Sequence, residues 1–302
     1  FSFKPWTEAK SIADGPSILQ YLKQTVAQFG IDKHIRYGQL VTKAQWSTDD
    51  AQWTVTSTNK ATGSSNTITC SFLFMCSGYY SYKKGHTPEF AGRERFKGRV
   101  VHPQEWPTDL DYAGKRVGII GAGATTVQMV PVLAKTAASV TVFQRTPNYI
   151  LPAMQKEMTP EWEKEIKDNY DAIVAKCRNH VFGMAFDSPV GRNAVDTPPE
   201  ERQRIFEENW TGSFRWVFET FDDLLANPEA NRMASEFIIA KMKERVNDPE
   251  IGNLLAPRFE DYPLFAKRPP LDHGYLEAYN EDHVTLVDIK DREPLVEITE
   301  TG

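Results

Sequence analysis

The residues whose spacing could do chemistry begin at a glycine turn near the middle of the chain. The stretch Lys115–Ile120 is typical of a short strand, and Gly121-Ala122-Gly123 follows it directly. Gly121 permits a tight turn, and Gly123 lets the backbone approach a pyrophosphate at the N-terminus of the next helix. The third position of this G-x-G-x-x-G pattern is Thr126 instead of a smaller residue, which makes the match incomplete. The candidate dinucleotide contacts are Gly121, Gly123, Ala124, Thr125, Thr126 and Gln128.

The charge that follows the second strand indicates which dinucleotide is bound. A unit that binds NAD usually places Asp or Glu about 20 residues beyond the turn, on the ribose hydroxyls. No acidic residue occurs between Asp111 and Glu157, and the run Val140–Phe143 leads instead into Gln144, Arg145 and Thr146. An arginine binds a 2′-phosphate through charge-assisted hydrogen bonds, whereas a carboxylate would repel it. The pattern favours NADPH over NADH, with Arg145 and Thr146 at the 2′-phosphate; the alternative is a solvated charge at a strand end.

A second motif precedes the glycine turn. The run from Phe96 to Pro107 has the form F-x-G-x-x-x-H-x-x-x-W-P, built from Phe96, Gly98, His102, Trp106 and Pro107. In this position the motif resembles the fingerprint of the type I Baeyer–Villiger monooxygenases. These flavoproteins use NADPH and dioxygen to insert one oxygen atom beside a ketone carbonyl.

The resemblance extends along almost the whole chain. Phe143–Pro147 and Leu264–Pro269 are similar to two later blocks of these enzymes, and Asp272–Asn280 is similar to a block of the cyclohexanone-type members. Residues 1–302 therefore resemble the middle portion of a longer protein. The resemblance implies FAD and NADPH as cofactors, and a small-molecule ketone and O2 as substrates.

The resemblance also assigns roles to three further residues. Lys267 is expected to join Arg145 at the 2′-phosphate, and His102 to couple domain movement to catalysis. Arg268 is expected to stabilise the flavin peroxide anion and to hold the nicotinamide. A guanidinium suits that role because it stabilises negative charge without giving up a proton. The catalytic candidates are thus Arg268 and His102.

The resemblance implies an α/β fold with a Rossmann-like NADPH-binding domain, a helical insertion and part of a FAD domain of the two-dinucleotide-binding type. We expect residues 1–78 to belong to the FAD-binding domain and residues 79–152 to the NADPH-binding domain, with the fingerprint linker at 96–107. Residues 153–263 are expected to form the helical insertion, and residues 264–302 to return to the NADPH-binding domain.

The elements that must position these residues follow from the apolar pattern. Helical spacing of Ile18, Leu22, Val26 and Phe29 predicts a helix that stops at Gly30. Trp53–Ser57 and Thr67–Met75 are expected to form a hairpin. Val117–Ile120, a helix over Thr125–Lys135 and Val140–Phe143 predict a βαβ unit with a parallel sheet. From Thr159 to about Asn247 the pattern is helical, with one helical face formed by Met233, Phe237 and Ala240, and Val284–Val287 is expected to be a strand.

Two departures leave other functions open. The chain contains no earlier G-x-G-x-x-G turn for FAD, and the family's acidic residue before an A-T-G-like turn is Ser71 here, ahead of Cys76-Ser77-Gly78. One alternative is a flavin-containing monooxygenase that oxidises nitrogen or sulfur atoms, although Trp106-Pro107 favours the Baeyer–Villiger type. A further alternative is a noncatalytic NADPH-binding module.

Composition excludes several classes of function. The net charge of −6 argues against a nucleic-acid partner, which usually selects a basic face. The three cysteines and six histidines show no metal-ligand spacing, so no metal is expected. No apolar run is long enough to span a bilayer, and a cytoplasmic location is expected.

Overall fold

The computed structural model describes residues 1–8, 10, 13–153, 158–210 and 213–302. Contacts within the chain divide it into two compact units. The first contains Phe1–Lys83 and Met158–Lys167, and the second contains Lys84–Glu157 and Asp168–Gly302.

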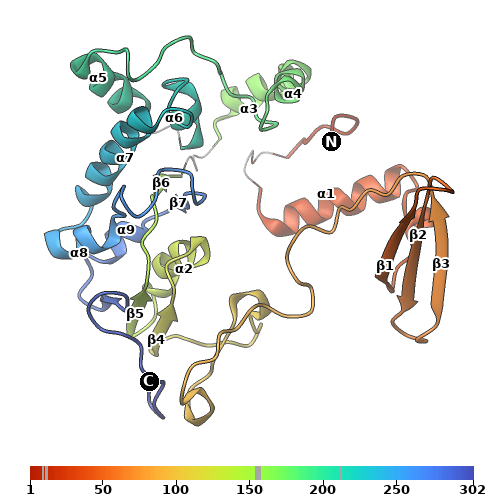
Figure 1. Cartoon of the computed structure of the whole chain (residues 1–302), viewed down its shortest axis with the longest axis horizontal. Coiled ribbons are helices and arrows are strands. Elements are labelled where there is room, and N and C mark those ends of the chain that lie inside the picture. The colour runs from red at the N-terminus through yellow and green to blue at the C-terminus, as the bar shows by residue number, and fades with distance from the viewer. Residues whose placement is uncertain (9, 11–12, 154–157, 211–212) are drawn as a thin grey trace. The chain divides into compact units, whose positions relative to one another are not determined.

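The first unit contains helix α1 (Gly15–Gln28) and an antiparallel sheet of β1 (Gln39–Ser47), β2 (Gln52–Asn59) and β3 (Ser65–Cys70) (Figure 1). Helix α1 begins where the Asp14 carboxylate accepts a hydrogen bond from the backbone N–H of Ser17 at 2.9 Å. It ends just before Gly30, which has a φ of +59°. The helix and the β2–β3 hairpin are as predicted, whereas β1 was not predicted.

The strand predicted to run through Met75 ends at Cys70, and that part of the prediction is wrong. Cys70 pairs with Trp53, and β2 begins one residue earlier, where the chain turns back towards β1. Residues beyond Cys70 therefore extend past the end of their partner strand. Phe72 and Phe74, which would have been strand residues, are 81% and 85% exposed.

The second unit is built on a parallel sheet with the strand order β4–β5–β8. Its strands are β4 (Arg116–Ile120), β5 (Ser139–Gln144) and β8 (Val284–Asp288), and helix α2 (Ala124–Leu133) connects the first two. The predicted βαβ unit is therefore confirmed. The core of this unit includes Val140 and Val142 of β5 and Val127 and Val130 of α2, all essentially inaccessible to solvent.

Most helices of the described chain lie, in sequence, between the sheet strands β5 and β8. They are α3 (Pro160–Asp168), α4 (Tyr170–Asn179), α5 (Pro199–Asn209), α6 (Phe214–Glu219), α7 (Pro228–Lys243), α8 (Pro249–Leu255) and α9 (Tyr275–Ala278). Two helices share a start signal, because Asn227 caps α7 and Asp248 caps α8, each followed by Pro and Glu. The short parallel pair β6 (Leu151–Pro152) and β7 (Leu271–Asp272) joins the two ends of this region.

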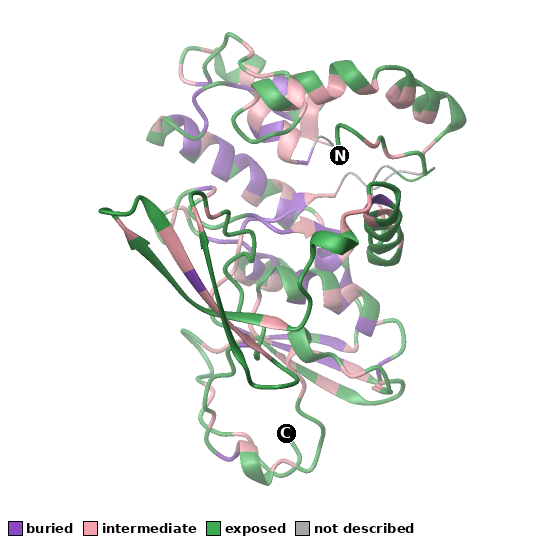
Figure 2. Cartoon of the chain, turned by 90° about the vertical axis from the view of Figure 1, so that its right-hand side faces the viewer, coloured by how far each residue is buried: buried purple, intermediate pink, exposed green. Residues whose placement is uncertain are grey.

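The helical region differs from its prediction in two respects. Residues 180–198 contain no helix, because Gly183 and Gly191 have φ values of +66° and +75° and Pro189 lies between them. The buried face of α7 is also rotated from the predicted one: Phe237 is buried, but Ala240 is exposed and Met233 is only half-buried. The fully buried positions Ala234 and Ile238 mark its centre, and Figure 2 shows buried residues along α7.

Three short 3-10 helices complete the described elements: η1 (Asp32–His34), η2 (Arg93–Arg95) and η3 (Pro103–Glu105). The third lies inside the fingerprint motif.

Candidate functional site

The glycine turn lies at the carboxyl end of β4 and opens helix α2. Gly121 has a φ of +108°, and its N–H donates to the carbonyl oxygen of Phe143 at 2.9 Å. A Cβ atom on Gly121 or Gly123 would meet no atom within 4 Å, so the space beside both glycines is open. Gly123 is the N-cap of α2 and no side chain caps this helix, so its first N–H groups are left for an anion. These features fit a bound pyrophosphate.

The structure explains why threonine is acceptable at the third position of the glycine pattern. Thr126 is 6% exposed, and its Oγ1 donates to the carbonyl oxygen of Gly121 at 3.0 Å. The side chain therefore packs between helix and turn and satisfies its own hydroxyl. The other candidate contacts on the first turns of α2, Ala124, Thr125 and Gln128, are exposed.

Arg145 and Thr146 follow β5 at the same edge of the sheet. Ile120 is in register with Phe143, so the turn after β4 and the loop after β5 leave the sheet side by side. Arg145 is exposed, and its side chain forms no hydrogen bond or ion pair with any residue that the structure describes. The charged Arg145 side chain is therefore exposed to solvent on the loop next to the open glycine turn.

A second cationic segment, the turn 262–268, is held against the loop after β5. The Tyr262 hydroxyl donates to the carbonyl oxygen of Pro147, and the Asn148 Nδ2 donates to the carbonyl oxygen of Arg268 at 3.2 Å. The backbone N–H of Leu151 donates to the carbonyl oxygen of Pro270 at 3.1 Å. These bonds join segments more than a hundred residues apart and bring Lys267 and Arg268 to the loop that carries Arg145.

Both cations of this turn are exposed. The Lys267 Nζ lies 4.3 Å from the centre of the Tyr262 ring, a cation–π contact, and its charge also helps to lower the pKa of the Asp261 carboxyl. Burial raises the pKa of Tyr262, so its hydroxyl stays protonated and continues to donate to Pro147. The arrangement therefore leaves two exposed cations on a turn that is hydrogen-bonded to the loop after β5.

The fingerprint motif has a steric explanation in this structure. A Cβ atom on Gly98 would lie 2.4 Å from the Cζ atom of Phe96, so the Phe96 ring can pack there only because residue 98 is glycine. The His102 Nδ1 accepts a hydrogen bond from the backbone N–H of Gln104 at 3.2 Å. Trp106 is 42% exposed and meets Tyr112 edge-to-face, and Pro107 is half-buried. Within the described residues, no hydrogen bond or ring contact joins His102 to Arg145 or Lys267.

The His102 ring lies on Gly85, a buried residue that the sequence did not single out. A Cβ atom at Gly85 would be 2.0 Å from the His102 Cε1, so the ring must move if residue 85 gains a side chain. We expect Gly85→Ala to lower the free energy of unfolding by about 1–3 kcal/mol, the usual cost of overpacking. Chemical denaturation would measure this difference.

Two further variants test that explanation. Gly15→Ala is the matched control, because a Cβ atom at Gly15 meets nothing within 4 Å and its φ is ordinary. His102→Ala combined with Gly85→Ala should recover most of the lost stability, since the clashing ring is gone. If the double variant is as unstable as the sum of the two single variants, the His102–Gly85 contact is not the cause.

Several residues that build the site were missed by sequence reasoning. Asn148 and Tyr262 hold the two loops together, yet each is an ordinary polar residue whose partner is more than a hundred positions away. Their only sequence signal is proximity to the Phe143–Pro147 and Leu264–Pro269 blocks.

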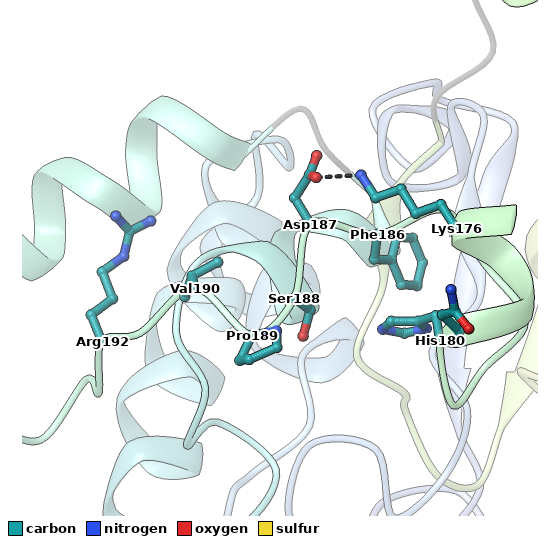
Figure 3. A pocket seen from close by; sticks show the side chains of 9 residues that line it. Lys176, His180, Phe186, Asp187, Ser188, Pro189, Val190 and Arg192 are labelled. Carbon is teal, nitrogen blue, oxygen red and sulfur yellow. Dashed lines mark hydrogen bonds and ion pairs between the residues drawn. The ribbon is translucent and has the colours of Figure 1, made fainter. Parts of the chain in front are cut away.

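A pocket of about 670 Å³ was also missed. It lies around residues 176–192, where the Lys176 ammonium pairs with the Asp187 carboxylate and His180 packs edge-to-face on Phe186 (Figure 3). No candidate site residue lines it.

A metal centre and a membrane span are two other classes of site. Among the described residues, no group of three or more His, Cys, Asp or Glu side chains could hold a metal ion. In the same part of the chain, no helix is both long enough and apolar enough to cross a membrane.

Comparison with known proteins identifies the family. The chain matches the family described as flavin-binding monooxygenase-like over residues 11–182. It is 38% identical to a cyclohexanone 1,2-monooxygenase of Acinetobacter sp. over 97% of this chain and 52% of that protein. It is 35% identical to a phenazine N-monooxygenase of Lysobacter antibioticus over 98% of this chain and 53% of that protein.

Solved structures agree with the sequence relatives. A crystal structure of OTEMO in complex with FAD and NADP matches with a TM-score of 0.84 and 34% identity, over 97% of this chain and 55% of that one. The chain spans about half the length of these relatives. Its α/β fold is that of these structures, and the chain belongs to the flavin-binding monooxygenase-like family of FAD- and NADPH-dependent enzymes, where it is related to the type I Baeyer–Villiger monooxygenases.

Proposed function

We propose that residues 1–302 are a portion of a Baeyer–Villiger monooxygenase that uses FAD, NADPH and dioxygen to convert ketones into esters or lactones. The observation that carries the proposal is the junction of the loop after β5 with the turn 262–268. It connects the segment of Lys267 and Arg268 to the loop that begins with Arg145, and this loop follows the strand next to the open glycine turn. The fingerprint motif and the 38% identity to a cyclohexanone 1,2-monooxygenase support the same reading.

In this proposal each part of the second unit has one task. Gly121, Gly123 and the first turn of α2 bind the pyrophosphate, and Arg145, Thr146 and Lys267 bind the 2′-phosphate. Arg268 carries a permanent positive charge towards the reacting atoms and stabilises negative charge that develops there. When bound, NADPH supplies a hydride, and FAD accepts it and activates dioxygen.

The proposed domain arrangement follows the same assignment. Residues 1–78 form part of a FAD-binding domain, and residues 79–152 with 264–302 form the NADPH-binding domain. Residues 153–263 are a helical insertion, and the fingerprint residues 96–107 link the domains, with His102 coupling their movement.

Oxidation of nitrogen or sulfur atoms is the second candidate function, and the 35% identity to a phenazine N-monooxygenase favours it. To decide between the two functions, the whole protein is incubated with NADPH and a panel of cyclic ketones, tertiary amines and thioethers, and the products are identified. Esters or lactones support the proposal. N-oxides or sulfoxides alone would select the second candidate, and NADPH binding with no oxygenated product would select a noncatalytic module.

A further inference from the structure

One buried side chain holds the start of the turn that carries Lys267 and Arg268. Asn231 lies on α7 and is 6% exposed. Its Oδ1 accepts from the backbone N–H of Leu264 at 2.9 Å, and its Nδ2 donates to the carbonyl oxygen of Leu264 at 3.2 Å. The same Nδ2 donates to the carbonyl oxygen of Leu224 at 2.8 Å. A single amide group thus satisfies both backbone groups of Leu264 and ties them to the helical region.

The turn needs such a constraint because its next residue is strained. Phe265 has a φ of +68°, which is disfavoured for any residue with a Cβ atom and persists only where the surroundings impose it. Its ring contacts those of Phe214 and Phe218, each with 5.9 Å between ring centres. Without the hold on Leu264, the backbone from Phe265 to Lys267 could relax to an ordinary conformation.

The other end of the turn is held separately. The Asn148 Nδ2 reaches the carbonyl oxygen of Arg268, and Pro269 and Pro270 are buried. Lys267 is therefore an exposed side chain between two fixed points, one supplied by α7 and the other by the loop that carries Arg145. A long ammonium side chain binds phosphate well only when its backbone is already in place, since otherwise binding must also pay for ordering the turn.

We propose that Asn231 is a positioning residue for NADPH recognition, which fixes the turn at Leu264 so that Lys267 stands at the 2′-phosphate. This inference rests on the proposed function. Asparagine suits the task because its amide offers an acceptor oxygen and an NH2 group with two donors at the same short reach, whereas aspartate has no donor and alanine has neither group.

The test compares two nucleotides that differ only in the 2′-phosphate. Binding of 2′,5′-ADP and of 5′-AMP to the whole protein is measured by calorimetry for the wild type, Asn231→Ala, Lys267→Ala and the double variant. Asn231→Ala should weaken 2′,5′-ADP about tenfold, the scale of one lost positioning hydrogen bond, and leave 5′-AMP unchanged. In the double variant, Asn231→Ala should add no further loss, because it acts through Lys267.

The control is Asn209→Ala. Asn209 is half-buried on α5 and donates to the carbonyl oxygen of Ile205 at 2.8 Å, so its removal costs one side-chain hydrogen bond to a backbone carbonyl away from the turn. It should change neither affinity. Equal losses of both nucleotides in Asn231→Ala, or additive losses in the double variant, would overturn the inference. If Lys267→Ala itself does not discriminate between the nucleotides, the proposed 2′-phosphate site is at fault instead.

A measurement on the wild type protects the test against a variant that does not fold. Amide hydrogen exchange should show the Leu264 N–H strongly protected, as the bond to Asn231 requires, while the Lys267 N–H exchanges quickly. Rapid exchange at Leu264 would remove the basis of the inference.

Discussion

Arg268→Ala should abolish formation of esters or lactones in the whole protein while NADPH consumption continues. Within the described part of the chain, the Arg268 side chain has no hydrogen-bond or ion-pair partner, and only its backbone carbonyl is held, by Asn148. The guanidinium is thus free to stabilise negative charge in the reaction. Removing one preorganised partner of this kind costs roughly 10²–10³ in rate. Gas chromatography of the products beside a spectrophotometric NADPH assay would measure the separation of the two activities.

Arg268→Lys is the informative companion variant. Lysine keeps the charge but lacks the planar guanidinium and can give up a proton, so it should restore only part of the activity. Ester formation at near wild-type yield by Arg268→Ala would show that Arg268 is not a catalytic residue. The turn 262–268 would then have no assigned catalytic role.

Arg145→Ala should weaken NADPH binding and leave NADH binding nearly unchanged. The Arg145 side chain is exposed and unpaired among the described residues, so its removal breaks no bond inside the protein. The expected loss is about 1.5–3 kcal/mol, as for a hydrogen bond to a charged group. Fluorescence titration with the two nucleotides measures both affinities, and Lys267→Ala should behave in the same way.

Arg116→Ala is the control for the change in net charge. Arg116 is the first residue of β4, whereas the glycine turn follows the last residue of the same strand. Like Arg145, Arg116 is exposed. Its replacement should affect neither nucleotide by more than a few tenths of a kcal/mol, since exposed charges at a distance are screened. Equal losses of NADPH and NADH in Arg145→Ala would contradict the 2′-phosphate assignment.

The features that could be predicted from sequence are those set by local stereochemistry. The glycine turn after β4 depends on a φ of +108° at Gly121, which glycine alone adopts readily, and the helix that follows needs only adjacent residues. Helix α1 was predictable because its apolar spacing and Gly30 lie within one short window. The parallel β4–β5 pair followed from the order strand, helix, strand.

Other features could not be predicted because they depend on partners distant in the chain. The end of β3 at Cys70 is set by where β2 begins, and the buried face of α7 by what packs against it. His102 lies on Gly85 because the backbone there is close enough to exclude a Cβ atom, which no local pattern indicates.

The sequence by itself determined the kinds of residue at the candidate site. These are the glycine turn, the arginine after the second strand, where an acidic residue would favour NAD, and the Lys267-Arg268 pair in a block that resembles the family. Only the tertiary structure decided that the turn 262–268 meets the loop after β5, through hydrogen bonds from Tyr262 and Asn148. It also decided that Asn231 of α7 is hydrogen-bonded to the backbone of Leu264. The physical reason is that hydrogen bonds between segments a hundred residues apart use ordinary polar side chains. Their meaning depends on which backbone group the fold places opposite them.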